Sequence, residues 1–230
     1  ELWEIPFLRT TNHMIQAQED FFRAYGHNSS RMGELDFLPL FGASILAYLH
    51  ATIDPSRRLL IKTPDVQYLS YFRHVFPFEN LLLVLRDGRD VVHSTLKTWP
   101  DSDFSLACET WNSSTRLILE LSQHWNQEDQ RFRVAKFEDA VRDPNRFLRN
   151  ICKCFDLDET KYPFKRIDNI PVRGSSQPDR GAVSWEGQQK PKGFNPIGRW
   201  KEWPDKWKET FKKVAGDTLV RAGYSTDTSW

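Results

Sequence analysis

The most distinctive hydrophobic pattern in the chain is a run of five aliphatic residues at positions 81–85, followed directly by the charged segment 86–90 (Arg-Asp-Gly-Arg-Asp). The run is too short for a typical helix and too apolar for an exposed strand, so it predicts a strand buried on both faces. Asp87-Gly88 is a turn signal, and Asp90 is placed to cap a helix that continues through Ser94. The pattern therefore predicts a strand, a turn and a helix.

Similar patterns on both sides of this segment predict further helices and strands. Apolar residues at helical spacing predict helices near 13–25, 35–51, 67–76, 104–125, 144–155 and 207–222. Short apolar runs predict two more strands at 59–62 and 132–137, and Gly223 is a C-cap signal for the last helix. Strands that alternate with helices are typical of an α/β fold with a parallel sheet. A length of 230 residues fits one domain.

Composition excludes several classes of protein. The 32 Lys and Arg residues nearly cancel the 31 Asp and Glu residues, which argues against a dedicated nucleic-acid-binding protein. The three cysteines form neither a disulfide framework nor a zinc spacing, and they are typical of a reducing compartment. No stretch resembles a transmembrane span or a signal peptide. We expect a cytoplasmic protein, or one of the Golgi lumen if an anchor precedes residue 1.

Two cations and a hydroxyl gather where the strand at 81–85 passes into the helix. Ligands of open α/β sheets bind outside the carboxyl ends of the strands. The guanidinium of Arg86 matches phosphate oxygens, Ser94 adds a neutral donor, and the helix N-terminus adds N–H groups. These features predict an anion site, most naturally for a nucleotide phosphate. In the alternative interpretation, Arg86 pairs with Asp87 or Asp90 and only stabilises the turn.

The segment 86–94 resembles the 3′-phosphate-binding motif of sulfotransferases that use 3′-phosphoadenosine-5′-phosphosulfate (PAPS). The resemblance covers most of the chain from about residue 59 to 224. It implies that Arg86 and Ser94 hold the 3′-phosphate, that PAPS is the sulfate donor and adenosine 3′,5′-bisphosphate (PAP) the product, and that no metal is needed. It also implies a three-layer α/β sandwich with a central parallel sheet, the P-loop fold that this family shares with nucleotide kinases.

The resemblance also suggests catalytic residues. Many sulfotransferases have a lysine at the end of a strand like 59–62, where it steadies the transferred sulfuryl group, and Lys62 occupies this position. The alternative is an ordinary surface lysine. The next residues are Thr-Pro, not the Thr-His in which a histidine is the base, so we expect a carboxylate base. Glu1 is preferred and Glu4 is the alternative, while His13 and His93 are weaker candidates.

Two further segments match the family in part. Phe137 stands where the family often has tyrosine, so a packing contact to adenine is retained and a hydroxyl contact is lost. The segment 172–196 is rich in Gly, Pro, Ser and Lys and is predicted to be a loop. Its Lys192-Gly193 partly matches a loop that covers the 3′-phosphate, although four residues instead of two precede Gly198. The alternative is a solvated linker.

The sequence contains no strand-to-helix turn that is rich in glycine and carries Lys or Arg with Ser or Thr for a 5′-phosphosulfate. We therefore expect a single sulfotransferase domain that lacks its first strand, phosphate loop and helix, and we expect these 230 residues alone to be inactive. The acceptor is a hydroxyl or amine on a small molecule, carbohydrate, lipid or peptide. Two alternatives remain: a nucleotide-binding module without activity, and a nucleotide-type kinase, which the absence of a Walker-type lysine disfavours.

Overall fold

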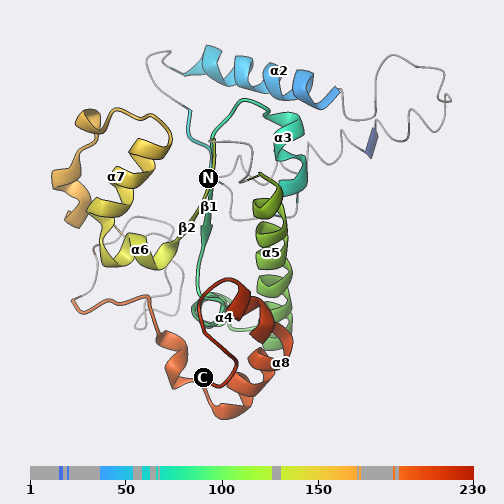
Figure 1. Ribbon diagram of the computed structural model, residues 1–230, viewed down its shortest axis with the longest axis vertical. Coiled ribbons are helices and arrows are strands. Elements are labelled where there is room, and N and C mark those ends of the chain that lie inside the picture. Colours follow the sequence, from blue (N-terminus) through green and yellow to red (C-terminus); the bar gives the residue numbers. More distant parts are fainter. Residues whose placement is uncertain are drawn as a thin grey trace. The chain divides into compact units, whose positions relative to one another are not determined.

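The computed structural model describes residues 37–53, 59–62, 68–125, 131–169 and 192–230, with the single positions 16, 17, 20, 66, 171 and 189. The chain divides into two compact units, residues 1–79 and residues 80–230, and each is considered separately below (Figure 1).

The described part of the first unit is helical. It contains α2 (Phe37–Thr52), a short 3₁₀ turn (Leu69–Tyr71) and α3 (Phe72–Val75). Leu38, Val75 and Phe76 form its buried core. At Gly42 a Cβ atom would stand 1.8 Å from the carbonyl oxygen of Val75, so only glycine allows α2 to approach α3 this closely. The range of α2 confirms the helix predicted near 35–51.

The prediction of a strand at 59–62 is wrong. These residues have no regular secondary structure, and the side chains of Leu60 and Ile61 are 91% and 47% exposed. A short apolar run becomes a buried strand only when a neighbouring strand pairs with its backbone, and the described residues offer it none. The helix predicted at 67–76 is shorter than expected, and the one predicted at 13–25 lies outside the described residues except at 16, 17 and 20.

The second unit contains a parallel pair of strands. β1 (Leu81–Leu85) lies beside β2 (Phe132–Lys136), with Leu81 opposite Phe132 and Leu85 opposite Lys136. The crossover between them consists of α4 (Gly88–Thr98) and α5 (Phe104–Trp125). Both strands and both helices agree with the sequence prediction. The expectation that β1 is buried on both faces is wrong at Val84, which is 48% exposed because no described element of this unit covers it.

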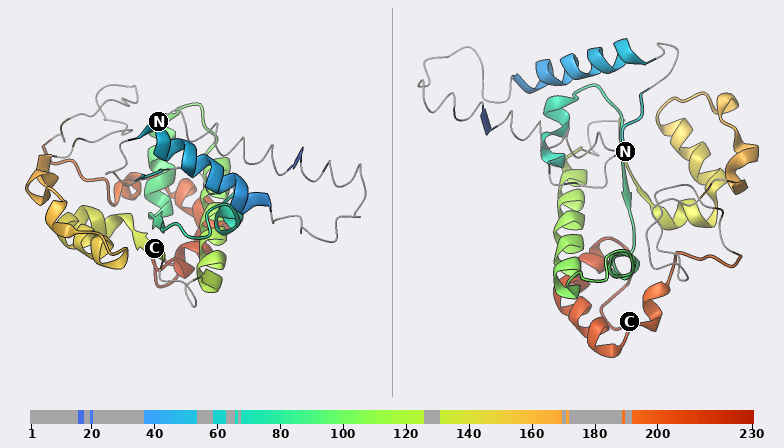
Figure 2. Two further views of the ribbon diagram at one scale, coloured as in Figure 1. Left: turned by 90° about the horizontal axis from the view of Figure 1, so that it is seen from above. Right: turned by 180° about the vertical axis from the view of Figure 1, so that it is seen from behind.

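Helices lie on both sides of this sheet (Figures 1 and 2). On one side are α5 and α8 (Asp205–Arg221), and on the other are α6 (Phe137–Arg142) and α7 (Pro144–Cys154). Asp143 caps α7 as predicted, because its carboxylate accepts the N–H of Arg146 at 2.9 Å. Short 3₁₀ turns span Glu159–Lys161, Phe164–Asn169 and Arg199–Glu202, the last labelled η4 below.

The main core of this unit forms where α4, α5, η4 and α8 meet. Its buried side chains are Val92, Cys108, Trp111, Trp203, Phe211, Ala215 and Leu219. Each large apolar side chain buried in this way contributes about 1.5–3 kcal/mol. α8 ends near the predicted position, with Ala222 as its C-cap and Gly223, the next residue, in a left-handed conformation (φ +71°). The core therefore anchors the N-terminal end of α4, where the charged segment 86–90 lies.

Candidate functional site

The turn between β1 and α4 is fixed by Asp87 and Gly88. The Asp87 carboxylate accepts the N–H of Arg89 at 3.0 Å, so Asp87 caps α4 and the expectation that Asp90 is the cap is wrong. Capping requires the residue just before the first helical turn, and α4 begins earlier than predicted, at Gly88. A Cβ on Gly88 would stand 2.4 Å from the ring of Trp111, so glycine is required for this close packing.

Arg89 and Asp87 form a buried bidentate ion pair. Nε and Nη2 of Arg89 donate to the two carboxylate oxygens of Asp87 at 2.9 and 2.7 Å. The Arg89 guanidinium also packs 3.9 Å from the ring centre of Trp200 and 4.5 Å from that of Trp230. Both charges are thereby paired within the protein, and Arg89 is not available to bind an anion.

Asp90 fastens a distant segment of the chain to α4. Its side chain is buried and accepts the backbone N–H groups of Gly198, Arg199 and Trp200 at 2.7, 2.7 and 3.4 Å. Gly198 has φ +79°, the left-handed conformation that brings these N–H groups together on one carboxylate. This contact places η4, and with it Arg199, beside the N-terminal half of α4.

Arg86 differs from its neighbours because no ion pair joins it to a carboxylate of the described residues. Its Nη2 donates to the carbonyl oxygen of Pro196 at 2.9 Å, and its guanidinium lies 4.7 Å from the ring centre of Phe137. Its Nε–H is buried without a hydrogen-bond partner in the described part of the chain. The alternative interpretation, in which Arg86 pairs with Asp87 or Asp90, is therefore not what the structure contains. A buried unpaired donor on a cation is a position that favours an anionic ligand.

Charges of both signs surround Arg86. Burial lowers the pKa of its guanidinium most, Asp90 and Glu138 raise it, and the positive charge of nearby Arg199 lowers it by a smaller amount. The group stays protonated, because the ordinary value is above 12. Burial, followed by Arg199 and Lys97, also lowers the pKa of His93.

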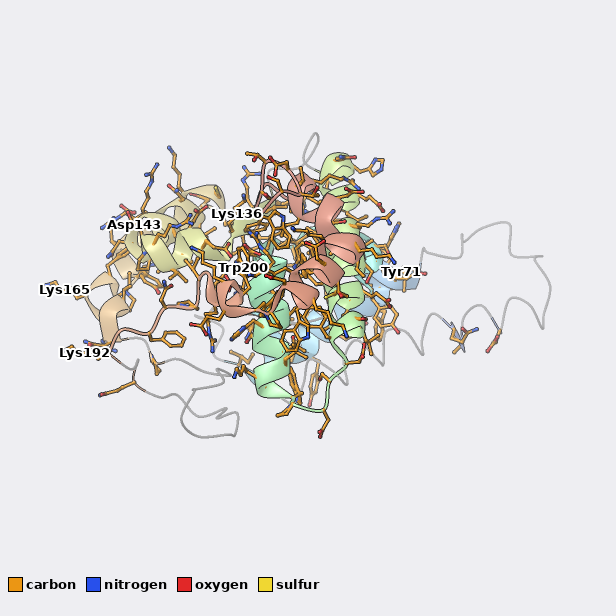
Figure 3. All side chains as sticks on the ribbon, turned by 90° about the horizontal axis from the view of Figure 1, so that it is seen from below. Tyr71, Lys136, Asp143, Lys165, Lys192 and Trp200 are labelled. Atoms are coloured by element: carbon orange, nitrogen blue, oxygen red, sulfur yellow. The ribbon has the colours of Figure 1, made fainter. Side chains whose placement is uncertain are left out.

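The structure brings together some of the residues predicted for the site. Arg86 contacts Phe137 directly, and Ser94 lies half-buried on α4, its hydroxyl without a hydrogen bond to the described residues. Lys192 and Gly193 are exposed, and Figure 3 shows Lys192 apart from Lys136 and Trp200, on the side of Lys165. A role for Lys192 and Gly193 stays a prediction.

The two predicted catalytic residues lie in the first unit. Lys62 is exposed in an irregular segment, and Glu1 lies outside the described residues. Both assignments stay predictions.

Arg199, Glu138 and Tyr224 lie in the site region but are not among the site residues predicted from the sequence. Arg199 follows Gly198 in a basic segment, and this was the only local signal that could have identified it. Glu138 and Tyr224 are found only through their contacts, because Glu138 is buried and bonds to both Asp87 and Tyr224. In the described part of the chain, no helix is long and apolar enough to cross a membrane, and no group of acidic, His or Cys residues is placed to hold a metal ion.

Comparison with known proteins identifies a similar fold and a family. Among solved structures, the sulfotransferase domain of the olefin synthase of Synechococcus PCC 7002 is similar to the chain, with a TM-score of 0.53 and 22% sequence identity. The match covers 87% of this chain and 79% of that domain, and at this identity it shows a shared α/β fold. No curated protein matches the chain.

A model of the sulfotransferase family matches residues 8–161, which is more than half of the chain. The protein therefore belongs to the sulfotransferase family. The matched range includes β1, the segment 86–94, β2 and Phe137.

Proposed function

We propose that this protein is a PAPS-dependent sulfotransferase whose segment 86–94 binds the 3′-phosphate of the donor. The family and fold support sulfuryl transfer, and the arrangement around Arg86 supports the choice of donor. Ser94 would donate its hydroxyl to the same phosphate, and Phe137 would pack against the adenine as it packs against Arg86. Arg199 is added to this set as a second cation.

One observation carries the proposal: of the charged side chains in segment 86–90, only Arg86 is free to bind an anion. Arg89 and Asp87 neutralise each other, and Asp90 binds backbone N–H groups of the 198–200 segment. Arg86 keeps a buried Nε–H without a partner in the described residues, and Arg199 adds positive charge nearby. A phosphate dianion would satisfy the donor and neutralise both cations.

In the reaction, an oxygen or nitrogen of the acceptor attacks the sulfur of PAPS in line. A new bond to sulfur forms, the bond from sulfur to the bridging phosphate oxygen breaks, and PAP leaves with the electron pair. Lys62 would stabilise the charge that develops on this bridging oxygen. Glu1 would accept the proton of the nucleophile, with Glu4 as the alternative base. The acceptor, a hydroxyl or amine compound, stays open.

The test of the donor site compares two ligands that differ only in the 3′-phosphate. Arg86→Ala in the full-length protein should weaken the binding of PAP by about 1.5–3 kcal/mol, a roughly 10- to 150-fold loss of affinity, because a hydrogen bond from a charged group is lost. Adenosine 5′-phosphate should bind almost equally to both proteins. Isothermal titration calorimetry measures both affinities, and Arg116→Ala, which changes an exposed arginine paired with Glu120, is the control. Equal losses for the two ligands would mean that Arg86 serves only the fold.

Enzyme activity distinguishes this proposal from a nucleotide-binding module without activity, which the absence of a phosphate loop in the sequence favours. The full-length protein should transfer labelled sulfate from PAPS to a member of a pooled acceptor library, and mass spectrometry would identify the product. Binding of PAP without transfer to any acceptor would support the inactive module.

A further inference from the structure

The peptide bond between Arg86 and Asp87 is held by side chains from two other elements. Its carbonyl oxygen accepts the indole N–H of Trp111 from α5 at 3.2 Å, and its N–H donates to Oε1 of Glu138 from α6 at 2.9 Å. Because the peptide group is planar, hydrogen bonds to both of its polar groups fix its orientation. The direction in which the Arg86 side chain leaves the backbone therefore depends on Trp111 and Glu138.

Glu138 can hold this peptide because a second donor shares its charge. The side chain is 4% exposed, and its other oxygen, Oε2, accepts the hydroxyl of Tyr224 at 3.1 Å. A buried carboxylate with one donor is costly, since it loses hydration that a single hydrogen bond does not replace. Tyr224 thus stabilises Glu138 in the position from which it bonds to Asp87.

Tyr224 is itself fixed to the end of the sheet. Its carbonyl oxygen accepts Nη2 of Arg89 at 3.2 Å, and Nζ of Lys136 lies 4.5 Å from the centre of its ring. Lys136, the last residue of β2, also donates to the carbonyl oxygen of Gly223 at 2.7 Å. The turn that follows α8 is therefore attached to both β2 and α4.

The hydroxyl of Tyr224 donates over the whole neutral pH range. Burial raises its pKa, and the charge of Glu138 and its hydrogen bond raise it further. The hydroxyl therefore keeps the proton that it donates to Glu138.

From these contacts we infer that Glu138 and Tyr224 are positioning residues for Arg86, and that they set the affinity of the site for the 3′-phosphate side of the donor. Neither needs to touch the ligand: Tyr224 orients Glu138, Glu138 orients the Arg86–Asp87 peptide, and the peptide orients Arg86. The inference rests on the proposed function, since it assigns these residues to the same phosphate site.

The experiment uses Tyr224→Phe, which removes one hydroxyl and keeps the ring. Titration of the full-length protein should show PAP binding weakened by about three- to tenfold, less than the direct cost of a hydrogen bond to a charged group, because Tyr224 acts on the ligand only through Glu138 and Arg86. The affinity for adenosine 5′-phosphate should stay unchanged. Tyr162→Phe is the matched control, because Tyr162 lies next to the 3₁₀ turn Glu159–Lys161 and packs on Phe164. It should change neither affinity.

A double-mutant cycle separates positioning from a general effect on the fold. In the Arg86→Ala background, Tyr224→Phe should produce no further loss of PAP affinity, because the side chain through which it acts is absent. An equal loss in both backgrounds, or a Tyr224→Phe protein that binds PAP like Tyr162→Phe, would overturn the inference and leave the proposed donor unaffected. A wild-type protein that binds PAP no better than adenosine 5′-phosphate would overturn both.

Discussion

At the scale of single residues, neighbouring charges in one short segment have different partners. Arg89 and Asp87 bind each other, Asp90 binds a remote backbone segment, and Arg86 contacts an aromatic ring and a carbonyl oxygen. Residue type alone does not predict this division, because both arginines and both aspartates have the same intrinsic chemistry. Burial and distance determine which charges pair, and they leave the Nε–H of Arg86 without a hydrogen-bond partner among the described residues.

His93 provides a pH-dependent prediction at this scale. Its pKa is lowered by burial and by the charges of Arg199 and Lys97, so the unfolded chain binds the proton more tightly than the folded protein. Stability should therefore fall as the pH drops below about 6.5, the ordinary value for histidine. NMR titration of the imidazole should give a pKa below that value in the free protein and a higher one with PAP bound, since the phosphate adds negative charge nearby.

His93→Gln is the check on the stability effect. The variant should lose the part of the acid sensitivity that appears just below pH 6.5, measured by urea denaturation at several pH values. A histidine that titrates at its ordinary pKa in the folded protein would contradict the prediction.

At the scale of secondary-structure elements, α4 organises the site because it holds η4 through Asp90. We predict that Asp90→Asn releases η4, since the amide group cannot accept three N–H groups as the carboxylate does. The amides of Gly198 and Arg199 should exchange hydrogen roughly 10- to 100-fold faster, as expected for loss of a hydrogen bond to a charged group. Hydrogen exchange followed by mass spectrometry or NMR measures this change.

Two observations control this experiment. The amide of Val91, which donates to Asp87 within α4, should keep its protection and show that the helix itself is intact. The variant Asp217→Asn changes an exposed aspartate of α8 and should alter neither region. Unchanged protection at Gly198 in Asp90→Asn would show that another contact holds η4.

The elements that the sequence predicts well are those specified by local patterns. The run at 81–85 and the long stripe of 104–125 appear in the structure with the expected bounds, because a short apolar run and a helical periodicity are both local signals. The strand at 59–62 fails because a strand needs a partner that a local pattern cannot supply. The cap of α4 differs from the prediction because the helix begins at Gly88, so Asp87 is the residue before it, while Asp90 accepts N–H groups of the distant 198–200 segment.

The residues of the candidate site also divide into those that a local sequence pattern identifies and those that it does not. Arg86 and Ser94 could be selected because they lie within one short motif. Glu138 and Tyr224 could not, because they reach the site through contacts with residues far away in the sequence, and Arg199 has only its place in a basic segment as a local signal. Spacing in the sequence carries no information on such contacts when they arise from the packing of α8 and η4 on the core.

At the scale of the whole molecule, residues 224–230 pack against the main core and contact the site. Trp230 packs against Phe211 and Trp200 with ring centres 5.9 and 5.2 Å apart, and Tyr224 bonds to Glu138. We predict that a stop codon after Gly223 destabilises the protein by about 3–5 kcal/mol, the cost of removing a large aromatic side chain from a core. Thermal denaturation followed by circular dichroism measures the loss.

A second variant distinguishes packing from the polar contact. Trp230→Ala in the otherwise intact protein removes the core contact and leaves Tyr224 in place, so it should account for most of the lost stability. A truncated protein that melts within a few degrees of the intact one would show that the C-terminal segment is dispensable.

The long sequence separation of the contacts around α4 also affects how the protein is made. Asp90 and Gly198 are 108 positions apart, and Arg89 and Tyr224 are 135 positions apart. At a synthesis rate of about 5–20 residues per second, the segment 86–94 leaves the ribosome roughly 7–27 s before Tyr224. During this interval the peptide of Arg86 and the ion pair of Arg89 lack their C-terminal partners. We therefore expect a nascent chain to bind the proposed donor nucleotide more weakly while it is being translated, because these contacts form only after α8 and Tyr224 have docked.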